Sequence, residues 1–296
     1  MIDGILAVDK PQGCTSHDVV ARVRFATGQR QVGHAGTLDP LATGVLVIVL
    51  GRATRLASYL VDSTKVYCAE IVLGATTATD DAEAPLQSHA PIGNLTAADI
   101  DRCLWRFVGP LEQVPPAYAA VKIGGERMYR LARKGAAPAA PARHVTVYEI
   151  RWLDWQPPHL RVRISCSAGT YIRSLARDVG AALGCGGYLH ALRRIESGGF
   201  RIDEAVPLAE LSLERVREAL APADRAVLTW PAAVLDSTRL ELVRDGRAVL
   251  LEASTTGNLR LYDSFGRLVA LARASGDVAQ PFRVFARGGA NGAGSD

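Results

Sequence analysis

The chain has 296 residues, of which 48% are hydrophobic and 22% are charged, and its formal net charge is +4. This length and composition predict a globular protein with one large domain and a small one. The sequence contains no apolar run near the roughly 20 residues that cross a bilayer, and its first apolar run is too short for a secretory signal, so we expect a cytoplasmic protein without a membrane anchor.

Apolar periodicity, turn residues and cap residues predict a succession of strands and helices. In chain order, we expect a strand at 4–11, a helix at 15–28, strands at 45–51 and 65–74, a helix at 96–109, a short basic helix at 125–135, strands at 144–155 and 159–169, a helix at 170–184 and a helical connector at 205–231. In the first helix, Ser16 is the expected N-cap and Gly28 the expected C-cap. Because the order shows no regular βαβ repeat, we expect an α+β fold with a mixed, largely antiparallel sheet flanked by helices.

The character of the sequence changes after residue 228. Short strand-like runs separated by turn signals, one of them at 264–266, predict a small β-rich module. The last residues are rich in Gly and predict a flexible tail. We therefore divide the chain into a first domain at 1–228, a module at 229–287 and a tail at 288–296.

The cysteines and histidines predict neither a disulfide framework nor a metal site. The five Cys residues form no CxxC pair, and the six His residues show no HExxH arrangement. Metal sites usually need ligands at such close spacings. We expect no metal and no other cofactor.

Positive charge is concentrated between residues 122 and 177. Eleven Lys and Arg residues stand there against three acidic residues. A basic field attracts a polyanion such as RNA, but on charge alone a solvated basic face explains it equally well.

Common catalytic signatures are missing from the sequence. It has no GxxxxGK[ST] phosphate loop and no GxGxxG after a strand, which argues against nucleotide-driven and hydride chemistry. Asp80 and Asp81 are adjacent, and adjacent side chains of an extended chain point apart, so they make a weak glycosidase pair.

The segment VGHAGTLDPLATGVL, residues 32–46, contains a single acidic residue, Asp39. Leu-Asp-Pro is a common turn start, and taken alone Asp39 is best explained as a turn residue before Pro40. The nearby His34 and three Gly residues form a loop that leads into a buried strand, and such loops often present a polar side chain at a site. Composition and spacing therefore indicate an accessible carboxylate in a constrained loop.

Five segments resemble the bacterial TruB family of pseudouridine synthases. GHAGTLDPLATGVL resembles the aspartate-bearing signature of that family, and the other matching segments are LAVDKPQGCTSHDVV, KVYCAEIVLGATTATDD, CSAGTYIRSLARDVG and ALRRIESGGF. The resemblance implies a pseudouridine-synthase fold followed by a PUA-like RNA-binding module. It also implies an enzyme that converts uridine 55 in the T-loop of tRNA to pseudouridine without a cofactor.

The resemblance further implies roles for individual residues. Asp39 matches the catalytic nucleophile, Arg173 the arginine that pairs with it, and Tyr67 the tyrosine that stacks on the target base. Tyr171 and Leu192 match residues that line the same pocket, and His34 matches a histidine that fills the space left in the folded RNA loop when the uridine flips out. Attack of Asp39 on the ribose, attack on the base and departure of the base through a glycal all stay open.

The resemblance also implies a partner for the positively charged region at 122–177, namely the T-arm of tRNA. We expect contacts with the RNA backbone from five side chains: Lys122, Arg127, Arg130, Arg133 and Lys134. No protein partner is implied, and we expect a monomer. The alternative is a non-catalytic RNA-binding or RNA-folding protein that uses the same surface.

Overall fold

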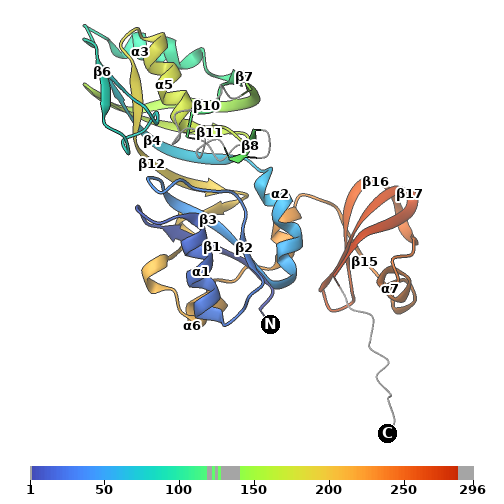
Figure 1. Cartoon of the computed structure of the whole chain (residues 1–296). Coiled ribbons are helices and arrows are strands. Elements are labelled where there is room, and N and C mark those ends of the chain that lie inside the picture. Colours follow the sequence, from blue (N-terminus) through green and yellow to red (C-terminus); the bar gives the residue numbers. More distant parts are fainter. Residues whose placement is uncertain (1, 119–121, 124–125, 128–140, 286–296) are drawn as a thin grey trace.

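The computed structural model in Figure 1 describes residues 2–118, 122–123, 126–127 and 141–285. A large sheet with several helices forms the first part of the molecule, and a small sheet with one helix forms the second (Figure 1). The predicted α+β class is confirmed.

The main sheet has ten strands within the described residues. They are β1 (Gly4–Lys10), β2 (Val32–His34), β3 (Thr43–Leu50), β4 (Lys65–Leu73), β7 (Gly109–Gln113), β10 (Arg143–Gln156), β11 (His159–Cys166), β12 (Gly187–Ser197), β13 (Phe200–Arg201) and β14 (Val206–Pro207). The order across the sheet is β14-β1-β3-β12-β4-β11-β10-β7, with β2 paired to β3 and β13 to β12. Only β1–β14 and β3–β12 are parallel among these described pairs, so the sheet is mixed and largely antiparallel, as predicted.

Helices pack mainly on one face of this sheet. The helices are α1 (Ser16–Thr27), α2 (Ala57–Val61), α3 (Ala97–Trp105), α5 (Ile172–Ala182) and α6 (Leu213–Ala219), with short 3-10 helices at Gly51–Leu56, Ile202–Glu204, Leu208–Glu210 and Ala223–Val227. Buried side chains of α1, α3, α5 and α6 share one core with every second residue of the central strands. In Figure 1, α3 and α5 lie near β10 and β11, whereas α1 and α6 lie near β1.

Strand β3 consists of a continuous apolar run because both faces of the sheet are covered at this strand. Leu46, Ile48 and Leu50 belong to the core under the helices, and the alternating valines belong to a second core on the opposite face, beneath α2. A strand covered on both faces has no solvated side to mark with polar residues.

A glycine fixes the crossing of β3 and β12. Gly44 lies opposite Arg194 in the parallel pair of these strands and has a φ of +98°. A Cβ atom on Gly44 would lie 2.2 Å from the Arg194 carbonyl oxygen, which neither backbone can accommodate without moving. This crossing places the Arg194 side chain beside the loop that precedes β3.

We expect Gly44→Ala to lower the free energy of unfolding by about 3 kcal/mol, because it combines a left-handed backbone with an overpacked contact. Urea unfolding measures the loss. Gly13→Ala is the matched control, since Gly13 has a φ of +86° with open space where its Cβ would be. Equal losses in the two variants would show that the Arg194 contact carries no cost.

The start of α1 differs from the prediction. Thr15 is the N-cap: its Oγ1 accepts from the Asp18 N–H, and the Asp18 carboxylate accepts from the Thr15 N–H at 2.8 Å. This reciprocal capping box outcompetes Ser16, which becomes the first helical residue. Gly28, in the left-handed conformation, is the C-cap as predicted.

Two predicted helices need correction. Within 125–135, the described residues form strand β9 (Glu126–Arg127), paired with β8 (Lys122–Ile123), and the others lie outside the described residues. In the sequence, two Gly residues separate these strands, a pattern typical of a hairpin. The connector at 205–231 is helical only in part: it begins with β14, and Pro207 and Pro222 lack the N–H that a continuous helix needs.

The C-terminal part contains a three-stranded sheet with its own core. Its elements are β15 (Ala232–Val234), α7 (Ser237–Arg244), β16 (Val249–Tyr262) and β17 (Leu268–Val284), and the core includes residues of all four. The predicted turn at 264–266 is confirmed, with the Asp263 carboxylate accepting from the N–H of Phe265 in the turn and from that of Arg267 directly after it. The predicted β-rich character is therefore confirmed, and the boundary at 228 stays a prediction.

A second small sheet pairs β5 (Ala75–Thr77) with β6 (Leu86–His89).

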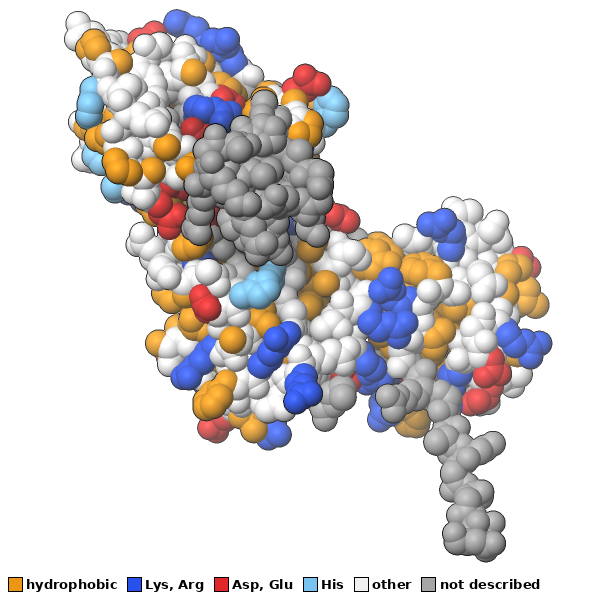
Figure 2. Space-filling model, viewed as in Figure 1, with side chains coloured by type: hydrophobic (Ala, Val, Ile, Leu, Met, Phe, Trp, Pro, Cys, Tyr) orange, Lys and Arg blue, Asp and Glu red, His pale blue; other side chains and the backbone are white. Residues whose placement is uncertain are grey.

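The charged side chains on the visible face are dispersed. Figure 2 shows Lys and Arg side chains at separate places on this face of the molecule, with acidic groups beside them on the C-terminal part. None of the helices in the described residues has the length and apolar character to cross a bilayer.

Candidate active site

The loop at 36–40, between β2 and β3, is fixed on both sides of Asp39. On one side, Ser16 Oγ of α1 accepts from the Leu38 N–H at 2.9 Å. On the other side, Lys10 Nζ donates to the Pro40 carbonyl at 3.4 Å, and Lys10 itself is fully buried. These contacts explain why the Lys-Pro segment and the first turn of α1 belong to the same site as the Asp39 loop.

Arg194 of β12 holds the same loop from inside the sheet. Its guanidinium donates to the carbonyls of Val45 at 2.7 Å, Thr37 at 3.2 Å and Gly36 at 3.2 Å. The side chain is 1% exposed, and its partners among the described residues are carbonyl oxygens. Arg194 therefore rigidifies the loop and leaves an uncompensated positive charge next to it.

Asp39 combines a turn with a solvent-accessible carboxylate. Its carbonyl accepts from the Ala42 N–H at 3.1 Å, which closes the predicted turn. Its carboxylate is 42% exposed and, among the described residues, is paired with Arg173, whose Nη2 is 3.0 Å from Asp39 Oδ2. Since backbone groups close the turn, the carboxylate is available for chemistry.

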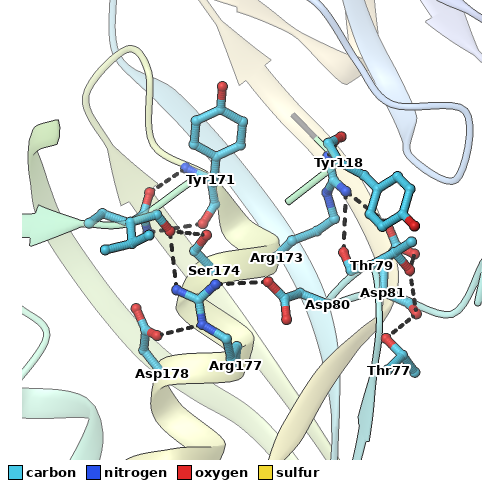
Figure 3. A network of polar contacts seen from close by, with 12 residues as sticks. Thr77, Thr79, Asp80, Asp81, Tyr118, Tyr171, Arg173, Ser174, Arg177 and Asp178 are labelled. Carbon is cyan, nitrogen blue, oxygen red and sulfur yellow. Dashed lines mark hydrogen bonds and ion pairs between the residues drawn. The ribbon is translucent and has the colours of Figure 1, made fainter. Parts of the chain in front are cut away.

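Arg173, in the first turn of α5, bridges two carboxylates. Its Nη1 is 3.3 Å from Asp81 Oδ2, on the opposite side from Asp39. The guanidinium is 8% exposed and Asp81 only 1%, and Thr79 supplies a further acceptor, its carbonyl, at 3.2 Å (Figure 3). A buried acid thus anchors the arginine that orients the accessible one.

Asp39, Arg173 and Arg194 line a cavity of about 260 Å³ between the Asp39 loop, β4, β12 and the start of α5. Tyr67 of β4, Leu192 of β12 and Tyr171 before α5 belong to its wall. Burial raises the pKa of the Tyr67 phenol, and the Arg194 charge only partly offsets this, so the phenol stays protonated near neutral pH. Burial also raises the pKa of Tyr171.

The geometry suits chemistry on a flat, uncharged ring. One wall presents a carboxylate with a fixed orientation, and another presents an aromatic side chain and an aliphatic one. Within the described residues, no three His, Cys, Asp or Glu side chains are grouped so as to hold a metal ion.

Comparison with known proteins identifies the family. Residues 24–172 match the TruB family pseudouridylate synthase (N terminal domain), and residues 173–228 match the tRNA pseudouridylate synthase B C-terminal domain. The tRNA pseudouridine synthase B of Thermobifida fusca is 44% identical over 97% of this chain and 99% of its own length. This chain belongs to the TruB family. The enzyme of the same name from Trichormus variabilis is 42% identical over 89% of this chain and 91% of its own length.

Solved structures agree with the TruB assignment. One chain of an H/ACA RNP bound to a substrate RNA containing 2'-deoxyuridine is 25% identical, with a TM-score of 0.73 over 96% of this chain and 85% of that one. A chain of a Cbf5-Nop10-Gar1 complex is 27% identical with the same TM-score and coverage. The expected pseudouridine-synthase fold with a C-terminal PUA-like module is confirmed.

The structure brings five of the predicted TruB site residues to one cavity: Asp39, Tyr67, Tyr171, Arg173 and Leu192. Their individual roles stay predictions. His34 lies in β2, 5.7 Å from the His17 ring, and is not among the residues lining the cavity.

The five predicted RNA-backbone residues are only partly described. Lys122 and Arg127 lie in β8 and β9, with side chains outside the described part of the structure. Arg130, Arg133 and Lys134 lie outside the described residues altogether.

Three residues of this TruB site were not predicted as part of it: Lys65, Asp81 and Arg194. Arg194 follows Arg193 in a strand, and alternation puts one of two adjacent side chains inside, so a strand with consecutive arginines indicates a buried cation. The sequence alone gives Asp81 no partner except the adjacent Asp80. Two adjacent acids that point apart make a poor pair, but each of them can serve a different arginine.

Lys65 caps the end of α2 at the cavity wall. Its Nζ donates to the carbonyls of Leu60 at 3.2 Å and Ser63 at 2.6 Å, and also to that of Val61. Burial, with a smaller contribution from the Arg194 charge, lowers the pKa of Lys65 from 10.5 to about 8. Between these values the unfolded chain binds a proton that the folded chain has released, so the free energy of unfolding rises with pH.

We therefore expect the wild type to gain about 2 kcal/mol of stability relative to Lys65→Met between pH 7 and pH 10. Urea unfolding of both proteins at the two pH values measures the difference, and other titrating groups cancel in the comparison. Identical pH dependence in the two proteins would contradict the lowered pKa of Lys65.

Proposed function

We propose that the chain isomerises uridine 55 in the T-loop of tRNA to pseudouridine, with Asp39 as the nucleophile. The observation that carries the proposal is the Asp39–Arg173–Asp81 bridge at the wall of a cavity that also contains Tyr67. The names of the relatives, tRNA pseudouridine synthase B, support the substrate class. We extend the proposal to a monomer that acts in the cytoplasm on the T-arm.

The reaction is an internal rearrangement. The bond from the ribose C1′ to uracil N1 breaks, a bond from C1′ to C5 forms, C5 loses its proton and N1 gains one. Atoms and electrons balance without an oxidant, a reductant or water. The protein therefore has to supply a carboxylate, keep the detached base in place and exclude water.

Each requirement has a candidate in the cavity. Asp39 supplies the electron pair, and its contact with Arg173 fixes its direction and favours its ionised form. Tyr67 offers a flat face on which the base turns, and Leu192 closes the wall beside it. A uridine stacked in an RNA loop has to leave its stack before it can reach Asp39 in the cavity.

A non-catalytic RNA-binding protein is the alternative. Binding RNA needs cations and stacking surfaces, and it does not need an accessible acid tied through a buried arginine to a second, buried acid. A carboxylate beside RNA repels phosphate and would weaken a site used only for binding. The arrangement favours catalysis.

The test uses an unmodified tRNA transcript incubated with the purified protein and mapped chemically for pseudouridine. We expect one modified position, in the T-loop at uridine 55. A transcript with cytidine at that position is the matched control and should give no product. Pseudouridine elsewhere in the first transcript, or none at all, would contradict the proposal.

A further inference from the structure

Two adjacent acids, Asp80 and Asp81, point to different arginines of the same helix. Asp80 has a φ of +59° and is the only non-glycine residue with a positive φ in the part of the chain that the structure describes. This conformation is unfavourable for a residue with a Cβ atom, and it turns the chain sharply between the two carboxylates. Figure 3 shows Asp80 directed toward Arg177 and Asp81 toward the side of Arg173.

Arg177 fastens this turn to α5. Its Nη1 is 2.8 Å from Asp80 Oδ2, and its Nη2 donates to the Val114 carbonyl at 3.1 Å. Arg173 and Arg177 are four residues apart and therefore lie on one face of the helix. The turn that contains Asp80 and Asp81 is thus held by two successive turns of α5 (Figure 3).

The turn that contains Asp80 and Asp81 also fixes the position of the Arg173 side chain. Two of the acceptors of the Arg173 Nη1 group, the Asp81 carboxylate and the Thr79 carbonyl, belong to it. If the turn shifts, a guanidinium that is 8% exposed loses both acceptors, and its contact with Asp39 changes with them. The exposed fractions of Asp80 and Arg177 are 15% and 31%, so solvent screens their pair less than it screens a surface pair.

We propose that the Asp80–Arg177 pair is a positioning element of the active site, which fixes the turn so that Asp81 holds Arg173 in line with Asp39. The inference rests on the proposed function, because its effect is on the isomerisation step. Neither residue touches the substrate. Their contribution reaches Asp39 through Asp81 and Arg173.

The primary test is Asp80→Asn, with pseudouridine formation measured under single turnover and tRNA affinity measured separately. We expect the rate to fall about tenfold, because sub-ångström misplacement of a catalytic group is costly, and the affinity for tRNA to stay unchanged. Arg177→Gln should give a similar loss, and Arg177→Lys, which keeps an ion pair, should restore most of it. Asp178→Asn is the matched control: Asp178 also pairs with Arg177, but it lies on α5 and does not touch the turn.

A double-mutant cycle separates positioning from a merely structural role. If Asp80 acts through the turn on Arg173, then Asp80→Asn should cost nothing further in an Arg173→Lys background, and a purely structural loss would multiply with it. If the Asp80→Asn variant does not fold, Arg177→Gln takes its place in the same double-mutant cycle, because this substitution leaves the residues of the turn unchanged. The positioning role is wrong if the single variants react within twofold of the wild type or if the losses multiply.

The outcomes also separate this inference from the proposed function. A wild type that forms no pseudouridine on the tRNA transcript refutes the proposed function. An active wild type with fully active Asp80→Asn and Arg177→Gln variants refutes the positioning element alone.

Discussion

Asp39→Asn is expected to abolish pseudouridine formation and to leave tRNA affinity nearly unchanged. The amide has the size of the carboxylate but no negative charge, so it cannot act as a nucleophile, and losses of a nucleophile reach about 10⁴-fold or more. Folding should be spared, because the side chain is 42% exposed and the Asp39 carbonyl closes the turn. Arg173 keeps its buried partner Asp81 in the variant.

The measurement for Asp39→Asn is single-turnover mapping of pseudouridine on the unmodified transcript, together with filter binding of the same RNA. Asp101→Asn is the matched control, since Asp101 is exposed on α3 and its replacement changes the net charge by the same amount. Product formation by Asp39→Asn at the wild-type rate would overturn the nucleophile assignment. Loss of RNA binding in Asp39→Asn alone would show instead that Asp39 serves recognition.

The elements with strong local signals were predicted well. The periodicity of the segment at 170–184 predicts one apolar face, and its residues in α5 are buried: Ile172, Leu175, Ala176 and Val179. The apolar stripe of a helix packs against the core, which here includes the sheet and α3. At Glu126 and Arg127, the described part of the predicted helix at 125–135, the structure has a strand instead. Helix-forming residues follow a Gly-Gly pair in this part of the sequence, and local propensity does not decide between a helix and a hairpin there.

The site was predictable in its parts but not in its connections. The resemblance to the family identified Asp39 and Arg173, but Asp81, the second partner of Arg173, depends on a turn whose left-handed residue is an aspartate. Glycine would have been the usual sequence signal for such a turn. Arg194 depends on β3 and β12 being parallel neighbours, a pairing between segments about 150 residues apart. The alternation of side chains along a strand predicts which face of the sheet a residue lies on. Only the order of the strands in the sheet determines which other residues that side chain contacts.

The second large effect is expected for Arg173→Lys, which should lower the rate of pseudouridine formation by about 10³-fold and leave tRNA affinity within about threefold. The guanidinium reaches Asp39 with one Nη atom and Asp81 with the other, at 3.0 and 3.3 Å. A lysine keeps the charge but has one nitrogen, so it cannot hold two carboxylates on opposite sides. Asp39 then keeps its charge and loses its fixed direction, which lowers the rate and not the binding.

Two comparisons decide the Arg173→Lys result. Arg106→Lys, at the exposed end of α3, makes the same replacement away from the cavity and should react like the wild type. Combining Arg173→Lys with Asp39→Asn should cost no more than Asp39→Asn alone, because an arginine that acts by orienting a carboxylate has no effect once the carboxylate is gone. A further loss in the double variant would mean that Arg173 contacts the RNA directly, and an unchanged rate in Arg173→Lys would mean that charge alone, without the two-sided bridge, is sufficient.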